Sequence, residues 1–117
     1  MKKILIVEDT ELNIDLLLQL LEDDYSLIVA RDGAQGVALA NEHKPDLILM
    51  DISLPVMDGY EATRNIRKTL PSTPIIGLSA HAMAADVGKA KAAGCNDYMT
   101  KPVDEDLLLR KLKDFLG

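Results

Sequence analysis

Two hydrophobic patterns alternate along the chain. Short continuous apolar runs, which are typical of strands buried on both faces, are separated by longer segments with apolar residues at helical spacing. The runs predict strands at residues 2–7, 26–30, 46–50, 74–80 and 97–101. The longer segments predict helices at about residues 11–23, 33–43, 59–69, 83–93 and 104–116. Five strand–helix units in succession predict an α/β fold, with a parallel sheet and helices on both faces.

Local signals mark several helix ends. Thr10 is a plausible N-cap for the first helix, and Asp58 with Glu61 forms a cap-like pair at the start of the third. Gly94 stands where the fourth helix needs a C-terminal cap. The run LLLQLL at residues 16–21 is expected to lie mostly in the core. It is too continuous for one helix face, however, so one or two of its leucines are candidates for contact with a partner.

Composition places the chain among ordered, globular proteins. Its 117 residues fit one domain, and the net charge of -6 argues against direct binding to nucleic acid or an anionic membrane. The apolar runs are too short to span a bilayer, and no leader pattern precedes the first predicted strand. The single cysteine, Cys95, has no partner for an internal disulfide. We therefore expect a cytoplasmic protein.

Polar residues stand at the ends of several predicted strands. Glu8 and Asp9 follow the first strand, Asp51 follows the third, Ser79 lies at the end of the fourth and Lys101 at the end of the fifth. In a parallel sheet with right-handed crossovers, these ends meet at one edge, where ligands bind. Carboxylates gathered there repel one another unless a pKa rises or a cation binds.

This set of side chains has the chemistry of a phosphoryl site. Mg²⁺ takes oxygen ligands and often shares its site with phosphate. The ammonium of Lys101 and the hydroxyl of Ser79 are both suited to an anionic group bound on the same metal. The pattern therefore predicts a Mg²⁺ and phosphoryl pocket in which a carboxylate is available for nucleophilic attack.

At these residues the sequence also resembles a known family, the receiver domain of two-component response regulators. The motifs that carry the resemblance occur in order and at family spacing: Glu8 and Asp9, Asp51 followed by LPVMDG at 54–59, Ser79, and Lys101 with Pro102. The resemblance covers residues 1–117 as one receiver domain. It implies a flavodoxin-like (βα)5 fold with strand order 2-1-3-4-5.

The resemblance further implies a phosphorelay function. Asp51 would accept a phosphoryl group from a phosphohistidine on a sensor histidine kinase or a histidine phosphotransfer protein. Asp9 and Asp51 would bind Mg²⁺ directly, Glu8 would bind it through water, and the backbone carbonyl of Ser53 would complete the protein ligands. Lys101 would pair with the phosphoryl group. The chain would thus be a switch that assists its own phosphorylation and dephosphorylation, and not an enzyme in the usual sense.

The family also implies a switching mechanism. Ser79 would move toward the phosphate after transfer, and Tyr98 would turn inward to fill the released space. These movements would change the 4-5-5 face, formed by the fourth helix, fifth strand and fifth helix, which a downstream protein would read. The protein would be a monomer or a phosphorylation-dependent dimer. Gly59 and Pro102 would be structural, with a cis bond before Pro102.

A few residues depart from the commonest family pattern. Glu8 replaces an aspartate often found there, and Ser79 replaces the frequent threonine, although both keep the chemistry. Gly88 is expected to weaken the fourth helix by about 1 kcal/mol relative to alanine.

Other functions fit the sequence less well than this one. The start at Met1 and the end after the fifth helix favour a stand-alone receiver, but a fragment of a larger regulator or hybrid kinase would look much the same. A haloacid dehalogenase-like phosphatase requires a second acid where Ser53 stands. In a flavodoxin-like cofactor binder, the loop after the first strand holds the phosphate of the cofactor, and here Glu8 and Asp9 would repel that phosphate. A pseudo-receiver that is not phosphorylated is disfavoured because the acids, Ser79 and Lys101 are all present.

Overall fold

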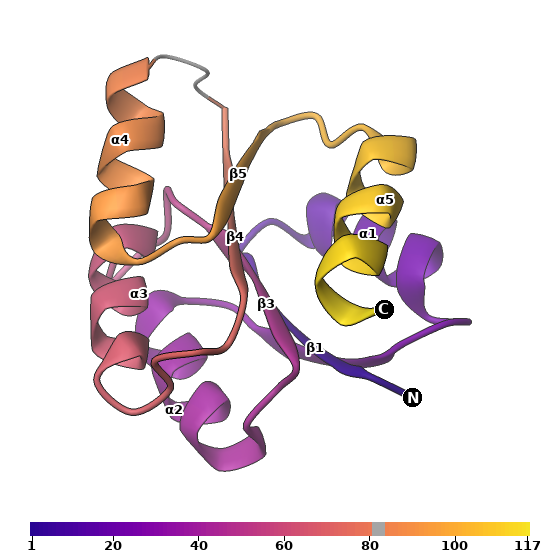
Figure 1. Ribbon diagram of the computed structural model, residues 1–117, viewed down its shortest axis with the longest axis horizontal. Coiled ribbons are helices and arrows are strands. Elements are labelled where there is room, and N and C mark those ends of the chain that lie inside the picture. Colours follow the sequence, from indigo (N-terminus) through magenta and orange to yellow (C-terminus); the bar gives the residue numbers. More distant parts are fainter. Residues whose placement is uncertain (81–83) are drawn as a thin grey trace.

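A computed structural model describes residues 1–80 and 84–117 of the chain. The strands are β1 (Lys3–Val7), β2 (Ser26–Ala30), β3 (Leu47–Asp51), β4 (Ile75–Ser79) and β5 (Asp97–Thr100). They form one parallel sheet in the order β2-β1-β3-β4-β5, which confirms the predicted fold. The helices are α1 (Glu11–Leu21), α2 (Gly33–His43), α3 (Gly59–Arg67), α4 (Ala84–Ala93) and α5 (Glu105–Leu116). Helices α1 and α5 cover one face of the sheet and α2, α3 and α4 the other (Figure 1).

Every predicted strand and helix has a counterpart within two residues at each end, except that the predicted start of the fourth helix, residue 83, lies outside the described residues. The cap at Asp58 is confirmed, because its Oδ1 accepts a hydrogen bond from the backbone N–H of Glu61 at 2.9 Å. Thr10 occupies the N-cap position of α1, but its side chain makes no capping hydrogen bond. None of the helices in the described ranges is long and apolar enough to cross a membrane.

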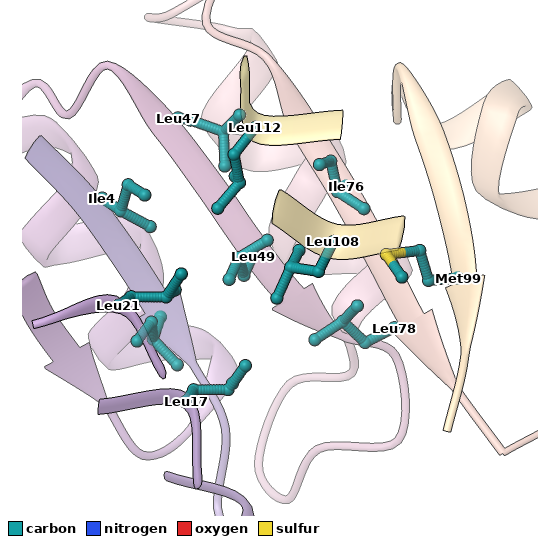
Figure 2. Packing of buried hydrophobic residues seen from close by; sticks show 11 residues of the cluster. Ile4, Leu17, Leu21, Leu47, Leu49, Ile76, Leu78, Met99, Leu108 and Leu112 are labelled. Atoms are coloured by element: carbon teal, nitrogen blue, oxygen red, sulfur yellow. The ribbon is translucent and has the colours of Figure 1, made fainter. Parts of the chain in front are cut away.

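The core consists of two hydrophobic layers separated by the sheet. Successive residues of β1 point to opposite faces, so that Ile4 and Ile6 pack under α1 and α5 while Leu5 and Val7 pack under the other helices. Figure 2 shows the first layer, in which Leu108 and Leu112 of α5 lie over Leu47 and Leu49 of β3, whereas Leu17 and Leu21 of α1 lie toward β1. All five residues of β3 are buried. The central strand is therefore rigidly held on both sides.

The leucine run in α1 divides as expected between core and surface. Leu17 and Leu21 are buried in the first layer, whereas Leu16 is 54% exposed. Exposed leucine surface on its own is common in monomeric proteins. Its use by a partner stays a prediction.

The start of α3 lies directly against the end of β3. The backbone N–H of Gly59 donates to the carbonyl oxygen of Ile52 at 2.9 Å. A Cβ at residue 59 would lie 2.3 Å from the carbonyl oxygen of Asp51 and 2.6 Å from the Cα of Ile52. Only glycine permits this approach, so the helix start and the strand end are fixed relative to each other. The bond between Lys101 and Pro102 is cis, as the family resemblance predicts.

Two glycine-to-alanine substitutions are expected to change stability in opposite directions. Gly59→Ala should lower the free energy of unfolding by about 1–3 kcal/mol, since the new methyl group overlaps the backbone of β3. Gly88→Ala, the matched control, should raise the free energy of unfolding by up to about 1 kcal/mol, because a Cβ in α4 meets nothing within 4 Å. Urea unfolding followed by circular dichroism measures both. A Gly59→Ala variant as stable as the wild type would contradict this account of the helix start.

Candidate functional site

The predicted polar residues meet at the carboxyl edge of the sheet. Glu8 directly follows β1, Asp51 is the last residue of β3, Ser79 is the last residue of β4, and Lys101 directly follows β5. Strands β1, β3, β4 and β5 are neighbours in the sheet, in register over these ends. The strand order thus brings together side chains that are up to 93 residues apart in sequence.

Three acids form a cluster at this edge. Glu8, Asp9 and Asp51 each offer a carboxylate oxygen, and these oxygens lie within 4.8 Å of one another. Glu8 is 0% exposed and Asp51 is 3% exposed, whereas Asp9 reaches solvent. Burying charged carboxylates side by side is costly unless positive charge is near. An all-oxygen set with one exposed member fits Mg²⁺, which keeps several of its waters.

Lys101 supplies the positive charge inside the cluster. Its Nζ lies 2.8 Å from Oε2 of Glu8 and 3.2 Å from Oδ2 of Asp51, and 19% of its side chain is exposed. Burial by itself lowers the pKa of Lys101, but the hydrogen bond to Glu8 and the charge of Asp51 outweigh burial, so that the pKa is raised. The ammonium group is therefore firmly protonated between two buried acids.

The pKa values of the two buried acids move in opposite directions. Burial raises the pKa of Asp51 to about 6, with a further contribution from the negative charge of Glu8. Burial also acts to raise the pKa of Glu8, but hydrogen bonds from Lys101 and Asn13 outweigh it, and the pKa is lowered. Glu8 thus holds its negative charge, while Asp51 is a carboxylate of increased basicity.

The oxygens that do not face Lys101 are also bonded. Oε1 of Glu8 accepts hydrogen bonds from Nδ2 of Asn13 at 3.0 Å and from the backbone N–H of Thr10 at 3.4 Å. Oδ1 of Asp51 accepts a hydrogen bond from the backbone N–H of Ser53 at 3.1 Å. Asn13 was not predicted to belong to the site. The sequence signal for it is a polar residue one helical turn before the buried Leu17, on the side of the helix that faces the core.

The remaining predicted residues lie around this centre. Ser79 is buried beside the end of β3, and Ser53 is exposed at the start of the loop after Asp51. Tyr98 is half-buried on β5, with its ring packed against Gly77 of β4. Pro102 is exposed.

Comparison with known proteins identifies relatives along nearly the whole chain. Residues 4–113 match the family described as the response regulator receiver domain. The polar-differentiation response regulator DivK of Brucella anthropi is 40% identical over 119 residues, which cover 99% of this chain and 97% of DivK.

Two solved structures are similar in both fold and sequence. The receiver domain of the sensor histidine kinase PA1611 of Pseudomonas aeruginosa, with a magnesium ion coordinated in its active site cleft, has a TM-score of 0.92 and 39% identity, and the match covers 99% of this chain and 98% of that one. The receiver domain of Ssk1 of Saccharomyces cerevisiae, in complex with the histidine phosphotransfer protein Ypd1, has a TM-score of 0.92 and 33% identity, covering 97% and 88%. The fold agrees with these matches, because helices cover both faces of a parallel sheet whose carboxyl edge carries the acid cluster. The chain therefore belongs to the response regulator receiver domain family.

Proposed function

We propose that Asp51 is the phosphoacceptor of this receiver domain, and that residues 1–117 act as one such domain. The observation that carries the proposal is the environment of Asp51: a buried carboxylate with its pKa raised to about 6, at the end of a rigid strand and 3.2 Å from an ammonium group. Increased basicity favours nucleophilic attack, and the ammonium group favours an incoming anion.

The donor would be a phosphohistidine on a sensor histidine kinase or a histidine phosphotransfer protein. An oxygen of Asp51 would attack the phosphorus atom, the phosphorus–nitrogen bond would break, and the donor histidine would leave. The product is an acyl phosphate on Asp51. Lys101 lies close enough to Asp51 for its ammonium group to form an ion pair with the new phosphoryl oxygens. The complex of the related Ssk1 receiver with Ypd1 supports a donor of this class.

Magnesium is the cofactor that the acid cluster supports. Asp9 and Asp51 would bind the ion directly, Glu8 would bind it through water, and Ser53 would offer its backbone carbonyl. When bound, Mg²⁺ would supply positive charge that offsets the acids and the phosphoryl oxygens. The proximity of the three carboxylates supports this ligand set, as does the magnesium ion of the related PA1611 receiver.

The signal would leave through the 4-5-5 face, which comprises α4, β5 and α5. Ser79 would turn toward the phosphoryl group, and Tyr98 would move inward against β4. Their positions support this route, because Ser79 ends the strand beside β3 and Tyr98 packs on Gly77 of that same strand. Phosphorylation would shift a population between two arrangements of this face, and a downstream protein or a second copy would bind the phosphorylated one.

Phosphorylation by a small donor tests the proposal. Incubation with Mg²⁺ and acetyl phosphate, followed by intact mass measurement, should show one added phosphoryl group. EDTA should prevent the addition, and Asp51→Ala should abolish it because the nucleophile is gone. Asp23→Ala, at an exposed aspartate outside the cluster, is the control and should be labelled as the wild type is. Absence of labelling by acetyl phosphate and by histidine kinases, with Mg²⁺ present, would instead indicate a pseudo-receiver.

The raised pKa of Asp51 leads to a stability prediction in metal-free buffer. Between its ordinary value of 3.8 and about 6, Asp51 binds more protons in the folded state than in the unfolded state, so its contribution to stability falls as pH rises through this window. Asp51→Asn should therefore raise the free energy of unfolding at pH 7 by on the order of 1–3 kcal/mol. The gain should shrink toward pH 4.

Urea unfolding with EDTA across this pH range measures the effect. Asp23→Asn controls for the loss of one exposed carboxylate. A gain from Asp51→Asn that stays constant from pH 4 to pH 7 would show that Asp51 has an ordinary pKa in the folded protein.

A further inference from the structure

Glu8 connects three parts of the site through one carboxylate. Oε2 faces Lys101 at the end of β5, while Oε1 faces Asn13 on α1 and the backbone N–H of Thr10. The side chain is 1% exposed, so water does not compete effectively for these oxygens. The direction of Oε2, and with it the position of the Lys101 ammonium, depends on what holds Oε1.

Asn13 is the stronger of the two partners of Oε1. Its amide is 3.0 Å away, whereas the N–H of Thr10 is at 3.4 Å, near the limit for a hydrogen bond. A hydrogen bond from a neutral donor to a charged acceptor is stronger than one between two neutral groups. Glutamate has three rotatable side-chain bonds, so without the amide its carboxylate would have several rotamers within reach.

The surroundings of Asn13 support a specific role for its hydrogen bond to Glu8. Asn13 is half-buried and lines a pocket of about 100 Å³ whose α1 side is otherwise leucine: Leu16, Leu17 and Leu20. It is also the third residue of α1, where a side chain often reaches back to accept the N–H of the N-cap residue. Here Glu8 accepts that N–H from Thr10, and Asn13 donates to Glu8 instead. The N-cap N–H and the side chain at the third helical position, which bond to each other in the usual capping pattern, thus both donate to Glu8 in the acid cluster.

We propose that Asn13 is a positioning residue for the chemistry at Asp51. Its amide holds Glu8 with Oε2 turned toward Lys101, which keeps the ammonium 3.2 Å from Asp51 and the Glu8 carboxylate within the metal-binding cluster. This proposal rests on the proposed function, since it assigns a role within that same site. Asn13 acts through Glu8 and touches neither the metal nor the phosphoryl group.

The first test is Mg²⁺ affinity of the unphosphorylated chain, measured by isothermal titration calorimetry. Asn13→Ala keeps a good helix former in α1 and removes only the amide. It should bind Mg²⁺ roughly tenfold more weakly than the wild type, as expected for loss of a residue that orients a metal ligand. Asn13→Gln, which retains an amide donor, should bind more tightly than the alanine variant. Asn41→Ala, a control at an exposed helical asparagine whose partner is Thr69, should match the wild type.

A double-mutant cycle with Glu8→Gln then tests the route of the effect. If Asn13 acts through the Glu8 carboxylate, Asn13→Ala should change Mg²⁺ affinity by less than about twofold in the Glu8→Gln background. A wild-type affinity for Asn13→Ala, or the same loss in both backgrounds, would overturn the proposal.

Labelling by acetyl phosphate at saturating Mg²⁺ tests whether Asn13 also positions the ammonium group of Lys101, because differences in metal affinity then no longer affect the rate. Asn13→Ala should be labelled more slowly than Asn41→Ala even when the metal site is full, because the ammonium is no longer held beside Asp51. Equal rates would refute positioning of Lys101. Should the wild type accept no phosphoryl group at all, the proposed function fails, while the Mg²⁺ cycle still decides whether Asn13 orients Glu8.

Discussion

The buried acids at the carboxyl edge of the sheet are stabilised by one ammonium group that lies between them. Lys101 lies nearer to Glu8 than to Asp51, at 2.8 Å against 3.2 Å. Hydrogen bonds from Lys101 and Asn13 lower the pKa of Glu8, whereas burial and the negative charge of Glu8 raise the pKa of Asp51. With Asp9, the cluster contains three acids, and Lys101 is the one lysine that the described residues show paired with any of them. When all are ionised, the cluster keeps a formal excess of two negative charges, which a divalent cation would neutralise.

The fold holds these charges together against their repulsion. Glu8 directly follows β1 and Asp51 ends β3, and these neighbouring strands pack into both core layers, so the backbone that carries each carboxylate cannot move away without displacing the core. The contact of Gly59 with the backbone of Asp51 and Ile52 prevents the end of β3 from moving toward α3. The free energy of packing in both layers therefore maintains an arrangement that is electrostatically unfavourable on its own.

Much of this could be predicted from the sequence, because it follows from backbone periodicity. Continuous apolar runs identified the strands, and parallel connections then required Glu8, Asp51 and Lys101 to share one edge. The pairing within that edge could not be predicted, since it depends on side-chain rotamers. Nothing in the pattern distinguishes a lysine paired with Asp51 from one that bonds Glu8 more closely. For the same reason, the sequence did not predict the hydrogen bond from Asn13 to Glu8 or the absence of a side-chain cap at Thr10.

The length of Glu8 explains why an additional partner is needed. An aspartate there would carry its carboxylate on a shorter and stiffer side chain, whereas glutamate reaches farther and has one more rotatable bond to restrain. In this chain the restraint comes from α1, through Asn13 and the N–H of Thr10, while the other oxygen reaches Lys101. The N-terminus of α1 also favours a negative charge beside it. Glutamate at residue 8 and asparagine at residue 13 are thus physically coupled, and a substitution at either residue changes the environment of Lys101.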